Sequence, residues 1–461
     1  GNSGKGKEYA YRSYFGRVMY SYADRYLFQA NIRHDGSSRF AKKHRWGTFP
    51  SFSAGWVLSE ENFMKNLNWD WLSFLKIRAT WGALGNERIG DFPYMSTIAF
   101  GNTIFYQNNG IYFDQTASQQ KYAIENVTWE KTESTDIGLD ISFLNNRLRV
   151  NGDYYWKNTK DMLLAMAIPD FLGFSDPDVN AGKMSTKGYE LNVSWNDHIG
   201  DFSYGIAINF SDFTSKMGDL QGTQFLGDKV KMEGSEFNEW YGYVSDGLFL
   251  TEEDLKNSPK INDKNTQLGD IKYKDISGPD GVPDGKISPE YDRVLLGSSL
   301  PHFLYGGNIN LGYKNFDLSL AFQGVGKQNA RLAREMVEPF RNNYGNFPAI
   351  IDGNYWSPYN TDEQNAVAKY PRLTHVNKSS NYAMSDYWLF NGGYFRLKNI
   401  TLGYTFPKEW MNAIGIKGAR IYASASDLFC LSKYPKGWDP EMGVSEYPIT
   451  TSILLGVSVN F

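Results

Sequence analysis

Apolar and polar residues alternate along many stretches of this chain. In the last stretch, apolar residues occupy every second position from Ile453 to Phe461, and the residues between them are small or polar except for Leu454. A period of two is the repeat of a β-strand, whose successive side chains point to opposite faces. The pattern therefore predicts strands with one apolar and one polar face.

About thirteen segments carry this alternation, each roughly 10–14 residues long. Strands of soluble sandwiches are usually about 5–6 residues long, whereas a tilted strand of about 10 residues crosses a bilayer. The lengths therefore favour membrane-spanning strands. The predicted strands lie near 11–22, 25–35, 46–58, 72–84, 132–144, 147–160, 184–197, 201–213, 300–313, 315–326, 393–406, 416–429 and 451–461.

The connections between these segments alternate between short and long. A transmembrane barrel has short turns at its periplasmic end and long loops at its outer end, and a soluble sandwich has no reason to follow that order. We therefore predict an all-β fold, a transmembrane antiparallel β-barrel with long extracellular loops. The tight turns are 23–24, 145–146, 197–200 and 314–315, and the long connections are 85–131, 161–183, 214–299, 327–392 and 430–450.

Composition changes this picture little. The chain has 31 Tyr, 30 Phe, 13 Trp and 45 Gly, which suits the aromatic girdles of a barrel and equally an aromatic-rich secreted sandwich. It contains no apolar run of about 18 residues, so a transmembrane helix is not expected. A net charge of −4 argues against nucleic acid as a partner. Cys430 is the single cysteine, which excludes an intrachain disulfide.

The strand count and the start of the chain indicate an upstream segment. Bacterial single-chain barrels have even strand numbers, and thirteen is odd. The stretch 1–7 has no apolar region of the kind found in a signal peptide. We therefore expect residues 1–461 to be the C-terminal portion of a barrel whose beginning precedes this chain.

Several sequence blocks resemble those of SusC/RagA-family TonB-dependent transporters, and they occur in the order of that family. Two further stretches upstream, 49–56 and 75–82, are also similar to the family, so the resemblance covers most of the chain. The blocks are Gly269–Ser277, Asp280–Gly285, Asp292–Gly297, Pro301–Gly307, Tyr355–Pro358, Lys369–Leu373, Tyr394–Tyr404 and Asp439–Glu441 before Tyr447-Pro448.

The resemblance implies a barrel of about 22 strands in the bacterial outer membrane, of which this chain would supply about the last three-fifths. It also implies an N-terminal plug pulled by TonB, a SusD-like surface lipoprotein as a lid, and import of oligosaccharides or peptides. We expect the plug, the TonB-contacting segment and the signal peptide to belong to the part of the protein that precedes residues 1–461. The resemblance also implies that the barrel assembly machinery recognises the terminal Phe461. The outer face of the barrel would contact outer-membrane lipid.

Two other classes of function stay open beside the importer. One is a passive porin-like channel or a surface-assembly scaffold built on the same barrel. The other is an enzyme, for which the sequence offers no support: it has no His-Glu-x-x-His metal motif and no Gly-x-Ser-x-Gly nucleophile elbow. An upstream plug with a TonB-contacting segment would distinguish the importer from the passive barrel.

Aromatic residues in the long loops are candidates for substrate binding. Their faces offer large contact areas to sugar rings or peptide side chains. The alternative is that they pack loop against loop or against the lid. The substrate-binding candidates are Trp240, Tyr241, Tyr243, Tyr355 and Trp356, with Tyr344, Tyr359, Tyr387 and Trp388 as further members of the set.

An acidic loop at 275–285 is a candidate Ca²⁺ site. It contains Asp275, Ser277, Asp280 and Asp284, whose oxygens are the kind of ligand that Ca²⁺ prefers. The spacing differs from an EF-hand, and no Glu occupies the twelfth place. The alternative is a turn-rich loop whose Asp side chains bond backbone amides. Apart from this possible Ca²⁺, no cofactor is expected.

Overall fold

The computed structural model describes residues 6, 8–107, 110–119, 122–166, 171, 173–174, 176–222, 226–341, 347–443 and 446–461. Within these residues, thirteen long strands form one antiparallel sheet in the order β1-β2-β3-β4-β7-β8-β11-β12-β18-β19-β22-β23-β24. Each predicted strand is present, with ends that shift by a few residues at most. The Tyr344 candidate lies outside the described residues.

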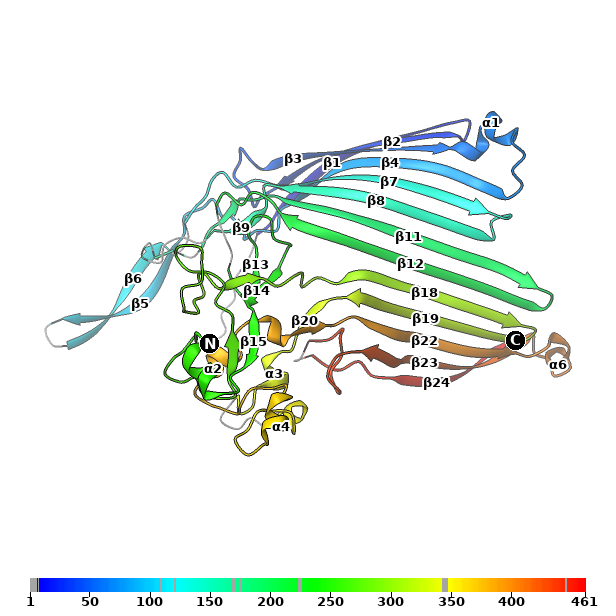
Figure 1. Cartoon of the computed structure of the whole chain (residues 1–461). Helices are drawn as coiled ribbons and strands as arrows, with labels where there is room; N and C mark the ends of the chain where they lie inside the picture. The colour runs from blue at the N-terminus through cyan, green and yellow to red at the C-terminus, as the bar shows by residue number, and fades with distance from the viewer. Residues whose placement is uncertain are drawn as a thin grey trace. The chain divides into compact units, whose positions relative to one another are not determined.

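The strands of this sheet are long (Figure 1), and their bounds coincide with the alternating segments of the sequence. Their bounds are β1 (Tyr11–Tyr22), β2 (Tyr26–Ser37), β3 (Trp46–Val57), β4 (Leu72–Asn86), β7 (Glu130–Phe143), β8 (Leu148–Lys160), β11 (Met184–Ile199), β12 (Phe202–Met217), β18 (His302–Tyr313), β19 (Phe316–Lys327), β22 (Tyr394–Thr405), β23 (Gly418–Ser432) and β24 (Ser452–Asn460).

Shorter elements lie in the connections. The short strands are β5 (Ile98–Gln107), β6 (Gly110–Gln119), β9 (Leu163–Ala165), β10 (Asp178–Asn180), β13 (Lys229–Val230), β14 (Glu239–Tyr243), β15 (Ser245–Leu248), β16 (Ile271–Tyr273), β17 (Arg293–Leu295), β20 (Asn329–Arg331) and β21 (Leu389–Asn391). The helices are η1 (Leu58–Glu60), α1 (Asn62–Lys65), α2 (Glu252–Asn257), α3 (Arg334–Val337), η3 (Ala349–Ile351), α4 (Asp362–Ala366), α5 (Lys378–Asn381), η4 (Asp386–Trp388) and α6 (Lys408–Asn412). No helix in the described part of the chain is long and apolar enough to span a membrane.

The polar face of the sheet is held by side-chain bonds between strands. On β2, Phe28 and Ile32 are exposed, whereas Asn31 between them donates to Ser51 Oγ at 3.1 Å and accepts from Arg17 Nε at 2.7 Å. This is the arrangement expected of a barrel wall, with apolar side chains toward lipid and polar ones inward. The apolar residues of β24 are likewise exposed, Leu455 to 82%.

The chain divides into two compact units, and an alternation of short and long connections appears in each. In the first unit, turns at 23–25 and 144–147 alternate with long connections at 87–129 and 161–183, but the short-edge connection 58–71 contains η1 and α1 and is longer than the long-edge connection 38–45. Consecutive strands are antiparallel, so every second connection lies at the same edge of the sheet. The units are Gly1–Leu191 with Phe213–Gln224 and Met232–Gly234, and Asn192–Asp212 with Phe225–Lys231 and Ser235–Phe461.

In the second unit, the tight turns at 200–201 and 314–315 alternate with the long connections 328–393 and 433–451, which agrees with the predicted order. The tight turns use residues with positive φ, such as Gly200 and Lys314. One short-edge connection, 406–417, is longer because it contains α6.

The connection 87–129 contains a hairpin that the sequence analysis treated as part of a loop. Strands β5 and β6 pair with each other from Ile98↔Gln119 to Gln107↔Gly110, and they form a separate two-stranded sheet (Figure 1). The order of short and long connections reports only which edge a connection occupies. It therefore carries no information about strands inside a connection.

Candidate functional site

The long connections of the second unit fold into a packed body, which we name the loop body and define as residues 235–301, 328–341 and 347–393. Its core consists of apolar and aromatic side chains that are at most 8% exposed. The loop body is thus a rigid support for side chains at its surface. The core residues are Tyr243, Leu248, Ile271, Tyr273, Ile287, Met336, Val337, Ile351, Tyr382 and Trp388.

A buried carboxylate, Asp270, joins three segments of the loop body. Its side chain is fully buried and accepts bonds from Arg372 Nε at 2.7 Å, Asn377 Nδ2 at 2.8 Å and Asn381 Nδ2 at 2.8 Å. A buried charge is tolerated when it is paired and hydrogen bonded in this way. The network therefore ties β16 to α5 and to the segment around residue 372.

The preceding residue, Gly269, explains why Trp356 lies beside this network. Gly269 has a φ of +84°, which favours glycine, and a Cβ at this position would collide with the Trp356 indole. The carbonyl of Gly269 accepts the N–H of Arg372 at 2.8 Å. Trp356 therefore has a fixed place against the backbone of the loop body.

The acidic loop at 275–285 shows backbone bonding by its carboxylates. Asp275 Oδ2 accepts the N–H of Gly285 at 2.6 Å, and Asp284 Oδ1 accepts the N–H of Lys286 at 3.0 Å. The N–H of Ser277 donates to the buried Asp292, outside the loop, at 3.3 Å.

The Asp280 carboxylate does not join the other acidic side chains in a cluster. In the described residues, no group of three or more His, Cys, Asp or Glu side chains is placed to hold a metal ion. The calcium site stays a prediction, and the observed bonds are those of the alternative turn-rich loop.

The five aromatic candidates occupy different environments. Tyr243 is part of the buried core, and Tyr241 is buried with the Arg293 guanidinium 4.7 Å from its ring centre. Tyr355 and Trp356 are half-buried and line a cavity of about 570 Å³, together with Arg372. The structure thus places Tyr355 and Trp356 where a ligand could reach them.

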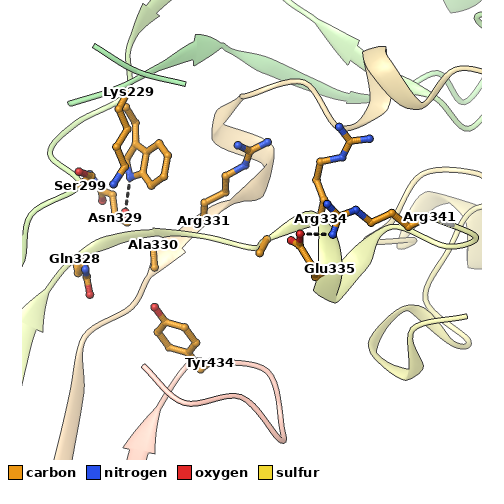
Figure 2. A pocket seen from close by; sticks show the side chains of 12 residues that line it. Lys229, Ser299, Gln328, Asn329, Ala330, Arg331, Arg334, Glu335, Arg341 and Tyr434 are labelled. Carbon is orange, nitrogen blue, oxygen red and sulfur yellow. Dashed lines mark hydrogen bonds and ion pairs between the residues drawn. The ribbon is translucent and has the colours of Figure 1, made fainter. Parts of the chain in front are cut away.

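Trp240, the fifth candidate, lines a separate cavity of about 390 Å³ that we name the cationic cavity. Its polar lining comes from four segments that are distant in sequence. Figure 2 shows Lys229, Arg331 and Arg334 on the same side of the segment 328–335. The polar side chains of this lining include Lys229, Trp240, Asn329, Arg331, Arg334 and Tyr434, with the pair Glu335–Arg341 beside Arg334 (Figure 2).

The elements around the cationic cavity fix two of its groups. Trp240 lies on β14, and its Nε1 donates to the carbonyl of Asn329 on β20 at 2.6 Å. The Lys229 ammonium lies 4.6 Å from the centre of the Trp240 ring. Loss of surrounding water lowers the pKa of Lys229 from its usual value of 10.5.

The cations of the cavity differ in their partners. Arg334 Nε donates to Glu338 at 2.7 Å, and Arg331 pairs with Asp228, a side chain that is 60% exposed. The Arg331 Nε is buried and has no acceptor among the described residues. Lys229 likewise has no carboxylate partner within the described part of the chain. The cavity therefore has an excess of positive charge.

Sequence reasoning missed both the buried network and the cationic cavity. A signal for the network was present, because Asp270 and Arg372 each belong to a block that carried the family resemblance. Two other blocks meet in the same way, since Arg396 Nη2 contacts Asp439 Oδ1 at 2.5 Å. The cavity had no such signal, because Lys229, Asn329 and Arg331 belong to no motif.

The strands and loops of this chain match a known family over most of its length. A family model described as "TonB dependent receptor-like, beta-barrel" matches residues 1–428. The chain belongs to this family of TonB-dependent receptor β-barrels. The predicted family, barrel fold class and outer-membrane location are thereby confirmed.

Two relatives and one solved structure illustrate the likeness. The receptor chain is 31% identical over 453 residues to TonB-dependent receptor P3 of Formosa agariphila, covering 93% of this chain and 42% of that protein. It is 32% identical over 468 residues to TonB-dependent receptor SusC of Bacteroides thetaiotaomicron, covering 97% and 43%. The chain spans less than half the length of these relatives.

The structure of the RagAB peptide transporter shows the same fold as the receptor chain. The TM-score is 0.78 at 23% identity, and the match covers 98% of this chain and 47% of that one. The two relatives are described as TonB-dependent receptors and this neighbour as a peptide transporter.

Proposed function

We propose that the complete receptor imports oligosaccharides or peptides across the outer membrane with energy from TonB. Family membership of the thirteen-stranded sheet carries this proposal. TonB would act through an N-terminal plug, and a SusD-like surface lipoprotein would close over the loop body as a lid. This chain's own part is the barrel wall and the ligand-facing loop body.

Two cavities lined mostly by residues of the loop body support a binding role. The first is lined by Tyr355 and Trp356, and the second is the cationic cavity with Trp240. Aromatic faces beside hydrogen-bonding groups suit sugar rings and peptide side chains alike. In this proposal Tyr241 and Tyr243 support the loop body through packing.

Growth on single carbon sources tests the proposal. Cells that rely on the complete receptor would be grown on a panel of oligosaccharides and peptides, with and without TonB. We expect growth on at least one of them to require both TonB and the receptor. Growth that needs the receptor but not TonB would contradict active import and indicate the passive porin-like channel.

A matched pair of variants tests the assignment of the site. Trp356→Phe keeps an aromatic ring against Gly269 but reduces the surface offered to a ligand, and should slow growth on the imported substrate. Trp410→Phe makes the same change at a Trp that is 57% exposed on α6, in a connection at the short-turn edge of the sheet and outside the loop body, and should leave growth unchanged. Equal growth of both variants would remove Trp356 from the binding surface.

A further inference from the structure

We propose that the cationic cavity binds a carboxylate group of an acidic oligosaccharide. This inference rests on the proposed import function and names the substrate class for it. It is carried by the charge, the hydrogen-bonding groups and the backbone geometry of one cavity in the second unit.

The charge of the cavity lining favours an anion. Four cations line it, Lys229, Arg331, Arg334 and Arg341, against a single carboxylate, Glu335. Two carboxylates outside the lining pair with Arg331 and Arg334, and one of them, Glu338, is shared with Lys378 at 3.3 Å. A net positive charge therefore remains in the cavity after these pairs are counted.

Two of the cations are placed to accept a ligand. Lys229 has no carboxylate partner in the described residues, so a ligand anion would be its ion-pair partner. Arg331 is only 16% exposed, and its Nη1 pairs with Asp228, whose side chain is 60% exposed, while its Nη2 donates to the carbonyl of Tyr382 at 3.3 Å. Each Nη carries two N–H groups, so a ligand carboxylate can share the Arg331 guanidinium through the N–H groups that these two partners leave.

The backbone at the cavity argues against binding of an extended peptide. A peptide is often bound as an added strand that pairs with a free sheet edge. Strand β20 lines the cavity and pairs with β21 on its other side. The Asn329 carbonyl of β20 already accepts Trp240 Nε1 at 2.6 Å, so an added peptide strand would have to compete with the indole for it.

Recognition at this cavity therefore falls to side chains. Gln328 and Asn329 provide amides and Tyr434 a phenol, and these groups can each donate or accept a hydrogen bond. Sugar hydroxyls also donate and accept, so they complement such a lining. An acidic oligosaccharide combines these hydroxyls with the carboxylate that the cations require.

Binding of a charged sugar and of its neutral ester tests the proposal. The complete receptor, purified in detergent, would be titrated with tetragalacturonate and with the same tetrasaccharide after methyl esterification, which removes the charges and keeps the sugar. We expect the acid to bind about a hundredfold more tightly than the ester, because the ester loses a charge-assisted hydrogen bond to each of two cations. Equal binding of the two, or no binding of the acid, would overturn the proposal.

Variants locate the binding to this cavity. Lys229→Gln should weaken binding of the acid about tenfold and leave binding of the ester unchanged, because it removes one charge-assisted bond. Lys229→Arg keeps the positive charge and should retain binding of the acid. That result would show that the loss in Lys229→Gln comes from the charge and not from misfolding caused by any substitution at this position. The control is Lys231→Gln, which removes the same charge two residues away, where the ammonium lies over the Phe237 ring at 5.3 Å. An equal loss in Lys231→Gln would show a general effect of charge and refute the site.

Two further outcomes separate the alternatives. If tetraglutamate binds as tightly as tetragalacturonate, the cavity selects acidic ligands without regard to sugar, and the oligosaccharide assignment fails. The binding measurement does not involve TonB. Acid-specific binding without TonB-dependent growth would therefore refute the proposed import alone, whereas TonB-dependent growth with equal binding of acid and ester would refute this site alone.

Discussion

Replacing Asp270 with Asn should weaken the loop body while leaving the barrel wall intact. The carboxylate is fully buried and accepts bonds from Arg372, Asn377 and Asn381. In the Asn variant, the Arg372 guanidinium loses its carboxylate, and an amide N–H₂ group faces donors that it cannot bond. The damage is confined to these contacts because Asp270 belongs to no strand of the large sheet.

The magnitude follows from the burial of the pair. Removing one partner of a buried ion pair costs about 3–5 kcal/mol. We expect the lower end, about 3 kcal/mol, because the Arg372 side chain is 14% exposed and keeps a bond to the carbonyl of Asn265 at 3.1 Å. A loss of that size raises the population of the opened loop body by about a hundredfold.

Amide hydrogen exchange measures this opening directly. The reporter is the N–H of Ile271, which donates to Asn381 Oδ1 at 2.9 Å. Its exchange should accelerate about a hundredfold in Asp270→Asn, whereas amides of β22 and β23 should not change. The control Asp246→Asn removes a half-exposed partner of Lys272 and should cost less than about 1 kcal/mol. Similar rates for Ile271 in wild type and Asp270→Asn would refute the reasoning.

Three further predictions concern the loop body and the end of the chain. Burial raises the pKa of Tyr273, so the stability of the loop body should fall as pH rises above about 10, and Tyr273→Phe should flatten that dependence in an alkaline unfolding titration. Millimolar Ca²⁺ should leave exchange of the Gly285 amide unchanged, because Asp275 already accepts that N–H; slower exchange would support the calcium site. Phe461→Ala should lower the amount of receptor recovered in the outer-membrane fraction without altering uptake per assembled molecule, and unchanged recovery would contradict the assembly role.

The strands could be predicted because their pattern is local. A period of two is visible within a single segment, so each of the thirteen strands of the sheet was found from its own residues. The order of short and long connections then placed the long loops at one edge. The hairpin of β5 and β6 was missed because it lies wholly inside one of those connections.

The candidate site could not be predicted in the same way, because its contacts join residues that are distant in sequence. Arg372 lies 102 residues from Asp270, and the Trp240 indole bonds a carbonyl 89 residues away. Segments of irregular backbone have no repeating pattern in the sequence from which such contacts could be predicted. The aromatic candidates illustrate this. Tyr243 and Trp356 are both aromatic residues of long loops, yet Tyr243 is buried in the core and Trp356 lines a cavity.

The sequence by itself therefore determined the wall of this receptor: its strands, their two faces and the edge at which its loops gather. Those properties follow from the spacing of apolar residues along the chain, which the strand repeat converts directly into geometry. Only the tertiary structure decided where charge collects, because the balance between Lys229, Arg331 and their partners depends on how distant loops pack. Packing left Lys229 without a carboxylate partner among the described residues, and we propose that a ligand carboxylate pairs with it.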